Sequence, residues 1–407
     1  MMIMDRFEEM RKEMQEVCEQ NILRFWIEKM TDTEHGGYYG RMDGRGKIVA
    51  DAEKGAVLNA RILWTFSAAY RVFRKSEYLR AAKRAMNYIQ KCFIDHRNGG
   101  VYWSVTSPGH PLDTKKQTYA IGFMIYGFSE FYRATGDEKA LTTALQLFYA
   151  IEFNAYDKVN NGYVEALTKD WQPIGDMRLS DKDENGSRTM NTHLHILEPY
   201  TNLYRCLKGS DKEQMLRERI KNLIQIFTQK LLNPKTFHLD LFFNDQWEGK
   251  RNVQSFGHDI EAVWLLHEAA LEIGEPDLLQ EIEALVPKIA KAADEGLQDD
   301  GSMIYERWTD TGDTDRERQW WVMCECIIGH VDLWQYFHDG HALEVALRCW
   351  EYIKKYLIDY QYGEWHWGVR EDGSLNLNED KAGFWKCPYH NTRLCLEVLE
   401  RFRNFKS

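Results

Sequence analysis

A unit of roughly sixty residues recurs six times along the chain, and each copy is marked by a turn that leads into an aromatic-rich segment. The turns are centred near Gly37, Gly100, Gly162, His238, Gly301 and Gly363. The steps between them are 63, 62, 76, 63 and 62 residues, so one copy carries an insertion. Apolar residues return every three or four positions before each turn, as in residues 77–89, and a second helical segment follows each turn.

Six repeats of helix, turn and helix predict twelve helices, and an alternating series of this kind can close into a ring with one set of helices inside. An open solenoid is the structural alternative. The second helices are expected to start near Leu58, Tyr119, Thr192, His258, Trp320 and Asn391. Several of them end in an aromatic–Arg pair, namely Tyr70-Arg71, Tyr132-Arg133 and Tyr204-Arg205. No linker interrupts the repeats, so we expect residues 1–407 to form one catalytic domain.

The charge balance and the cysteines limit the class of protein. There are 52 Lys and Arg against 63 Asp and Glu, a net charge of −11, which argues against nucleic acid and anionic membranes as partners. No segment approaches eighteen consecutive apolar residues, and the first residues lack the pattern of an export signal. Eight scattered cysteines show no metal-type spacing, so we expect reduced thiols and a cytoplasmic protein.

Polar residues that are unusual on apolar helices occur near the start of the second helix in every copy. They are Asn59 and Arg61, Tyr119, Asn191 with His193 and His195, His258 and Glu261, Trp321 and Glu325, and His390 and Arg393. In a closed ring this level of each repeat converges on the axis. A single histidine in such a place is more often structural than catalytic, but four at one level favour a functional site.

The same residues are also compatible with two other kinds of site. His258 and Glu261 are three residues apart and share a helix face, so with His193 and His195 they suggest a divalent metal site. Helical residues two apart point about 200° from each other, however, so His193 and His195 do not face one ion. Glu261 and Glu325 are a carboxyl pair of the kind that hydrolyses glycosides. Histidines suit reversible proton transfer near neutral pH better.

Some tryptophans are predicted to lie in loops rather than on helices. They are Trp308, Trp321, Trp365 and Trp385. Most tryptophans in a helical ring are core residues, since this side chain is highly buried on average. As a set, those in loops offer flat apolar faces that suit the C–H surfaces of a sugar.

At these positions the sequence resembles the N-acylglucosamine 2-epimerase superfamily, and most closely its cellobiose 2-epimerase branch. The resemblance spans the chain through residues 54–64, 191–198, 257–262, 320–325 and 386–393. The Asn191-Thr192-His193-Leu194-His195 segment is typical of the disaccharide epimerases, whereas N-acylglucosamine epimerases have an apolar stretch there. The resemblance implies an all-α (α/α)6 barrel, no metal and no organic cofactor. It also implies reversible epimerisation at C2 of the reducing-end glucose of β-1,4-linked disaccharides such as cellobiose and lactose.

The resemblance also implies roles for particular residues. His258 and His390 would carry protons on opposite faces of C2, and Arg61 would stabilise the enediolate oxygens. Glu261 would hold the tautomer of the His258 imidazole, because it follows one helical turn later. The remaining expected site residues are His195, Asn191 and Tyr119 at sugar hydroxyls, Glu325 beside the histidines, Trp321 and Trp385 on the reducing sugar, and Trp308 and Asp183 at the second sugar.

The insertion in the third copy, residues 182–187 with their flanks, is polar and contains glycine. It is expected to be a rim or lid over the second sugar because it closely precedes His193. Four alternatives stay open at this point. An aldose–ketose isomerase uses the same enediolate, and an N-acylglucosamine 2-epimerase acts on a different sugar. A glycoside hydrolase releases monosaccharides, and a helical interaction scaffold has no catalytic activity.

Overall fold

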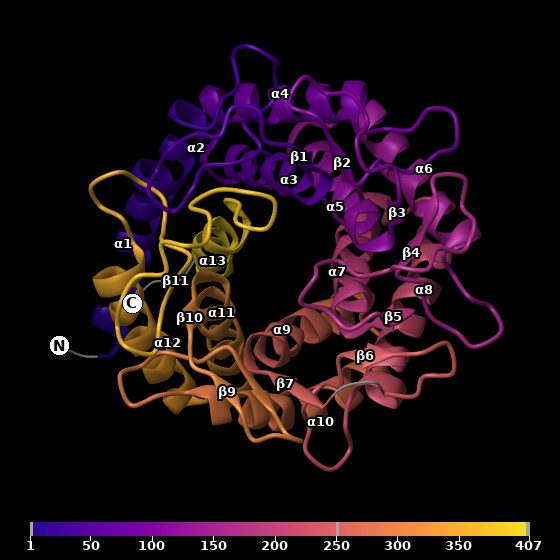
Figure 1. Cartoon of the computed structure of the whole chain (residues 1–407). Coiled ribbons are helices and arrows are strands. Elements are labelled where there is room, and N and C mark those ends of the chain that lie inside the picture. The colour runs from indigo at the N-terminus through magenta and orange to yellow at the C-terminus, as the bar shows by residue number, and fades with distance from the viewer. Residues whose placement is uncertain (1–2, 250–251, 404–407) are drawn as a thin grey trace.

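The computed structural model describes residues 3–249 and 252–403, and within them the inner helices form a closed ring (Figure 1). The inner helices are α3 (Ala56–Phe73), α5 (Thr118–Thr135), α7 (Met190–Leu207), α9 (Phe256–Ile273), α11 (Trp320–Phe337) and α13 (Tyr389–Arg401). Each one contacts the next around the axis, and α13 contacts α3. The chain is therefore an (α/α)6 barrel, and the open solenoid is excluded.

An outer layer of helices packs against this ring. It consists of α1 (Ile3–Glu16), which continues through the π-helical η1 (Val17–Leu23) into α2 (Arg24–Glu28), and of α4 (Ser76–Cys92), α6 (Glu138–Asn154), α8 (Glu213–Ile226), α10 (Pro276–Ala293) and α12 (Gly340–Tyr352). Short η2 (Phe227–Leu231), η3 (Asp294–Gly296) and η4 (Ile353–Leu357) follow α8, α10 and α12. Outer helices bury one face, as α4 buries Tyr78, Ala82, Ala85 and Ile89, whereas α3 is buried throughout residues 56–69.

The observed helices match the predicted repeat. With α1 to α2 taken as one helix, the described residues contain the twelve expected helices. The inner helices begin within two residues of the predicted starts. No helix in the described part of the chain is both long enough and apolar enough to cross a bilayer.

Each of the predicted turns is closed by an isolated β-bridge. The bridges join Thr31 to Tyr38, Ile94 to Val101, Tyr156 to Tyr163, Leu232 to Leu239, Leu297 to Met303, and Ile358 to Trp365. Gly37 shows why glycine recurs in these turns. Its φ is 65°, and a Cβ added there would lie 2.6 Å from Cγ of Tyr88, so any larger residue would be strained and would clash.

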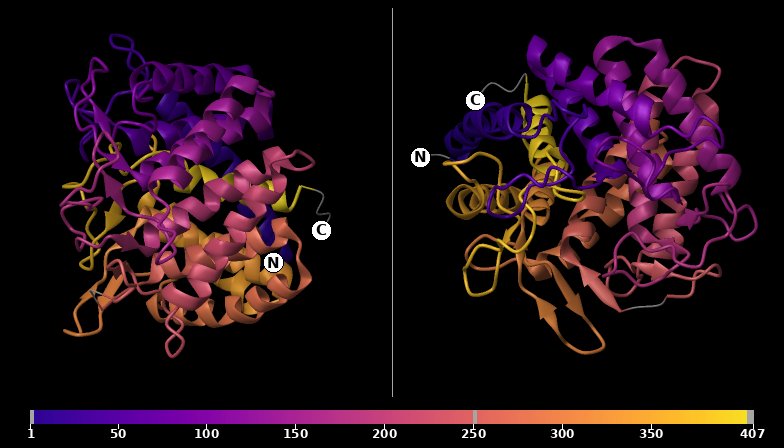
Figure 2. Two further views of the ribbon diagram at one scale, coloured as in Figure 1. Left: turned by 90° about the vertical axis from the view of Figure 1, so that its right-hand side faces the viewer. Right: turned by 45° about the horizontal axis from the view of Figure 1, so that its top comes forward.

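Short antiparallel strands join neighbouring repeats at one end of the barrel (Figure 2). The pairs are β1 (Lys54–Gly55) with β2 (Ser104–Val105), β3 (Lys116–Gln117) with β4 (Ala166–Leu167), β5 (Arg188–Thr189) with β6 (Phe242–Phe243), β7 (Val253–Ser255) with β8 (Glu306–Trp308), and β10 (Arg318–Gln319) with β11 (Gly368–Val369). The strand β9 (Thr314–Asp315) extends the β7–β8 sheet, and a bridge from Met42 to Ala382 joins the sixth repeat to the first. Because a strand precedes most inner helices, the N-termini of these helices gather at this end, which we call the mouth.

At the opposite end, polar side chains link each inner helix to the next, and we call this set the polar belt. Arg71 of α3 donates to Glu130 of α5 at 2.6 Å and to Glu400 of α13 at 2.7 Å. The other links are Arg133 to Asn202, Arg205 to Glu272, His267 to Asp332, and Arg401 to Asp332. The belt explains the aromatic–Arg pairs of the sequence, because their arginines are its members.

We expect the belt to stabilise the ring. Replacing Arg71 with Ala removes both of its links and leaves the buried Glu130 less well paired. The free energy of unfolding should fall by about 3 kcal/mol, as for other broken buried ion pairs. In the matched control Arg24→Ala, which breaks an exposed pair with Glu28, the loss should stay under about 0.5 kcal/mol. Urea denaturation of the two variants measures the difference, and equal losses would contradict a stabilising role for the belt.

Candidate active site

Most of the predicted site residues gather inside the mouth, on the first two turns of the inner helices. Tyr119, His258, Trp321 and His390 lie in the first turn of their helices, whereas Arg61, His195, Glu261 and Glu325 lie one turn deeper. The N-terminal ends of all these helices carry partial positive charge. The site is therefore suited to negative charge on a bound ligand and unsuited to protonated histidine.

Arg393 of α13 connects the deeper layer of the site. Its guanidinium is fully buried, and Nη2 donates to Oε1 of Glu261 at 2.6 Å and to Oε1 of Glu325 at 2.7 Å. Nη1 donates to Glu198 of α7, which also accepts a hydrogen bond from the hydroxyl of Tyr389. One cation thus joins carboxylates from three helices. Sequence reasoning missed Glu198 and Tyr389, although Glu198 stands three residues after His195 and Tyr389 four before Arg393.

The three histidines at the axis are all held through Nδ1. The bonds run from His390 to Glu325 Oε1 at 2.7 Å, from His195 to Glu198 Oε2 at 3.0 Å, and from His258 to Ser255 Oγ at 2.8 Å. Burial lowers the pKa of all three imidazoles, and that of His258 falls to about 3. Each is therefore neutral near pH 7 and keeps Nε2 for another partner.

A break in α7 sets the position of His195. Pro199 lies four residues later and has no N–H to donate, so the carbonyl of His195 lacks its helical hydrogen bond. The backbone at His195 has φ −89° and ψ 15°, outside the helical values. That carbonyl lies against Gly122 of α5, where an added Cβ would stand 2.5 Å from the oxygen. The kink leaves the His195 ring 5.1 Å from the ring of Tyr119.

Arg61 contributes a second buried guanidinium, which differs from that of Arg393. Nη2 donates to the hydroxyl of Tyr119 at 2.9 Å, and the group lies over the rings of Phe123 and Tyr389 at 4.2 and 4.8 Å. Among the described residues no carboxylate pairs with it. Its charge is therefore available to an anionic ligand at the axis.

Trp321 lies beside both of the predicted proton carriers. Its ring centroid is 4.8 Å from that of His258 and 5.8 Å from that of His390. The indole N–H donates to Gln319 Oε1 at 2.8 Å, which fixes the plane of the ring. Trp321 belongs to α11, so the prediction that it lies in a loop was wrong, but its half-buried face is within the site.

The other tryptophans occupy different places. Trp385 lies in the segment before α13, 6.0 Å from the ring of Tyr119, and is half-buried. Trp308 is also half-buried and ends strand β8 at the mouth. Trp365 is fully buried, so it is a core residue and offers no face to a sugar.

The insertion in the third repeat lies at the mouth beside His258. A cavity of about 100 Å³ is lined by His258, Asp183, Asn191, Glu165, Tyr305 and Glu306, among others. Asp183 accepts from the backbone N–H of Ser180 at 2.9 Å, and Oδ1 of Asn191 is buried without a protein partner. The structure thus brings Asp183 and Asn191 to one cavity with His258. Sequence reasoning missed Glu165, whose pKa burial raises to about 8.

The predicted partner of His258 was wrong. Glu261 follows it by one helical turn, but Oε1 of Glu261 accepts from Arg393, and Oε2 lies 3.8 Å from Nε2 of His195. The guanidinium draws the carboxyl away from His258, whose Nδ1 bonds the hydroxyl of Ser255 instead. Burial and the nearby charge of Glu325 raise the pKa of Glu261 to about 8. The Glu261–Glu325 pair therefore retains a proton near neutral pH.

The prediction that His193 lies at the axis with the other polar residues was wrong, although helical geometry correctly predicted that it does not face the same point as His195. Nδ1 of His193 donates to the carbonyl of Thr189 at 2.7 Å, and Nε2 accepts from the backbone N–H of Tyr163 at 3.0 Å. Both ring nitrogens are thereby used within the protein. His193 and His195 accordingly do not form one metal site.

One group at the axis has the spacing of metal ligands. Ligand atoms of Glu261, Glu325 and His390 lie within 4.8 Å of one another. Arg393 donates to both carboxylates, and Glu325 also holds the imidazole of His390. The guanidinium therefore already supplies positive charge where a cation would bind.

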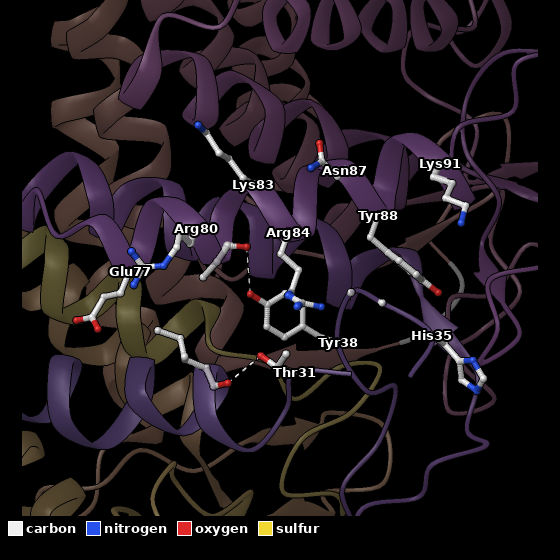
Figure 3. Close-up of a pocket in the computed structure, with 14 residues that line it drawn as sticks. Thr31, His35, Tyr38, Glu77, Arg80, Lys83, Arg84, Asn87, Tyr88 and Lys91 are labelled. Carbon is white, nitrogen blue, oxygen red and sulfur yellow. Dashed lines mark hydrogen bonds between the residues drawn. The ribbon is translucent and has the colours of Figure 1, made fainter. Parts of the chain in front are cut away.

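A larger groove of about 780 Å³ lies outside the ring, between α4 and the turn at residues 35–38 (Figure 3). Arg84 and Tyr88 face Tyr38 across it, and the Tyr38 hydroxyl donates to the carbonyl of Ala81 at 3.1 Å. None of the predicted site residues lines this groove. The site is therefore distinguished by its chemistry rather than by the size of its cavity.

Comparisons with known proteins agree with this geometry. The family profile of N-acylglucosamine 2-epimerase (GlcNAc 2-epimerase) matches residues 37–393. The chain is 55% identical to the cellobiose 2-epimerase of Bacteroides fragilis, over 96% of this chain and 98% of that protein. It is 37% identical to the cellobiose 2-epimerase of Ruminococcus albus, over 96% and 99%.

A solved structure gives the same result in three dimensions. The cellobiose 2-epimerase of Bacillus thermoamylovorans superposes with a TM-score of 0.92 at 39% identity, covering 97% of this chain and 100% of that one. Sequence and structure agree over nearly the whole length of the chain. The chain belongs to the N-acylglucosamine 2-epimerase family.

Proposed function

We propose that the chain is a carbohydrate epimerase that inverts C2 of the reducing-end glucose of β-1,4-linked disaccharides such as cellobiose and lactose. The observation that carries the proposal is the set of three imidazoles anchored through Nδ1, which surrounds the axis beside the Arg61 guanidinium. The likeness to cellobiose 2-epimerases supports the choice of substrate.

The reaction needs proton carriers of this kind. The proton on C2 of a hexose is acidic only when C1 is a carbonyl, so the sugar ring must first open with the help of an acid and a base. Removal of the C2 proton then gives an enediolate, and inversion requires a proton to return from the opposite face. His258 and His390 are suited to these two roles because they reach the axis from different helices and both border Trp321.

Charge develops on the oxygens of the enediolate, and the site offers two sources of stabilisation. Arg61 is permanently charged and bonds no carboxylate among the described residues. The N-terminal ends of the inner helices add partial positive charge in the same direction. Both are in place before the reaction, so little reorganisation is needed when the anion forms.

Glycoside hydrolysis fits the same residues less well. A hydrolase needs two carboxyl groups flanking the glycosidic bond, one of them free to protonate the leaving oxygen. Glu261 and Glu325 are both tied to Arg393, and Glu325 also holds His390. These carboxyls serve the histidines rather than a scissile bond. An aldose–ketose isomerase shares the enediolate, so the reaction product separates it from an epimerase.

Incubation with cellobiose or lactose should yield the corresponding 4-O-linked mannose disaccharide. NMR or chromatography of the equilibrium mixture measures this product. We expect the same rate in EDTA, because Arg393 supplies the positive charge beside Glu261 and Glu325. A ketose as the main product would favour the isomerase, and release of monosaccharides would favour the hydrolase. Loss of activity in EDTA that is restored by a divalent ion would contradict a metal-free mechanism.

Replacing Arg61 with Lys should lower kcat by about a hundredfold, as removal of a donor to a developing anion does. The lysine keeps one charge but loses the planar fork that bonds Tyr119 and spans the rings of Phe123 and Tyr389. Steady-state kinetics of a variant with unchanged thermal stability checks this. A near-normal kcat would make Arg61 a structural residue.

His258→Asn and His390→Asn should each abolish epimerisation, because inversion needs a carrier on both faces of C2. A variant that keeps one carrier should still exchange the C2 proton of one epimer with solvent deuterium, since removal and return on one face need one base. Mass spectrometry of glucose-ended and mannose-ended substrates in D2O measures this exchange. Full epimerisation by either variant would overturn the two-carrier assignment.

A further inference from the structure

Ser255 occupies a position in which serine ordinarily caps a helix. It is the last residue of β7 and the N-cap of α9, and its backbone is extended, with φ −108° and ψ 102°. Serine at this position usually accepts a hydrogen bond from a backbone N–H of the first turn, which stabilises the helix end. Here the side chain makes no cap bond. Its Oγ lies 2.8 Å from Nδ1 of His258, the third residue of the helix.

The other helices show that capping is available in this fold. Asp137 caps α6 by accepting from the backbone N–H groups of Lys139 and Ala140 at 2.9 and 3.2 Å. Thr189 caps α7 by accepting from Thr192 at 3.0 Å. Ser255 is fully buried, so no water of the bulk solvent competes for its hydroxyl. The Ser255 hydroxyl thus bonds the imidazole of His258 and not the backbone N–H groups at the start of α9.

His258 also differs from the other two axial histidines in its partner. His390 and His195 bond carboxylates, which only accept and therefore fix a proton on Nδ1. A hydroxyl both donates and accepts, and it carries no charge that would favour the imidazolium. The same ring has Trp321 on one side at 4.8 Å and borders the cavity that contains Asp183 and Asn191. Among the described residues, Ser255 is the one hydrogen-bond partner of the His258 ring.

We propose that Ser255 is a positioning residue that holds His258 through Nδ1, so that Nε2 faces the reacting carbon. Because its hydroxyl makes this bond, α9 begins without a side-chain cap. This inference rests on the proposed role of His258 as a proton carrier. It makes the two carriers unequal, because His390 is supported by a carboxylate and His258 by a neutral group. His258 has the neutral partner, so its protonated imidazole is stabilised less than that of His390. His258 therefore releases the proton that it carries more readily.

Ser255→Ala and Ser255→Thr test the proposal, with Asp137→Ala as the matched capping control. Ser255→Ala should lower kcat at least about tenfold, since a positioned acid or base contributes ~10²–10⁴ to rate. KM and the urea midpoint should change little, because the Ser255 hydroxyl bonds His258 and makes no cap bond to α9. Asp137→Ala should lower the midpoint and leave kcat unchanged. Ser255→Thr keeps the hydroxyl and should recover activity.

Two further measurements separate positioning from a general structural defect. In ¹⁵N-labelled protein, the His258 ring signals should shift in Ser255→Ala, which removes the hydrogen-bond partner of Nδ1, and should return in Ser255→Thr. Deuterium exchange at C2 should slow for one epimer more than for the other, whereas a structural defect slows both equally. A wild-type kcat, or unchanged His258 signals, in Ser255→Ala would overturn the proposal. If the wild-type protein does not epimerise disaccharides, the proposed function fails, while the ring signals still test the bond to Ser255.

Discussion

The site depends on one buried guanidinium. Arg393 holds Glu198, Glu261 and Glu325, and two of these carboxylates in turn hold His195 and His390. Removing one partner of a buried charge cluster costs several kcal/mol because the other charges lose their compensation. The geometry of the histidines and the packing of α13 against its neighbours therefore depend on the same contact. The contacts of Arg393 thus join four of the six inner helices, namely α7, α9, α11 and α13.

The number of charges in this cluster also matters. Arg61 and Arg393 bring two positive charges to three buried carboxyls, and the histidines are neutral. Charge balance is reached when one carboxyl keeps its proton, and Glu261, with its pKa raised to about 8, is the one best placed to keep it. The protein thus contains a proton close to His195 without a protonated histidine at the axis.

The sequence predicted the number and order of the helices and the level at which their polar residues meet, because the repeat sets them, whereas closure into a barrel followed from the family resemblance and not from the repeat alone. It also predicted that His193 and His195 point apart, since that follows from helical geometry alone. It failed for Glu261. Spacing along one helix predicts which residues share a face of that helix. It does not predict a stronger partner on another helix, and Glu261 bonds Arg393, which is more than a hundred residues away in the sequence. Ser255 was missed for a related reason, because a serine before a helix is normally a cap.

The junction between the sixth repeat and the first is fastened like the others. At the mouth a bridge joins Met42 to Ala382, and in the polar belt Arg71 bonds Glu400. Near the outer layer, Arg11 of α1 donates to the carbonyl of Phe402 at 2.8 Å. Among the described residues, the first and sixth repeats are thus joined at the mouth, in the polar belt and near the outer layer. A circularly permuted protein, in which the sixth repeat is linked to the first and the chain is opened in another turn between repeats, would contain the same barrel.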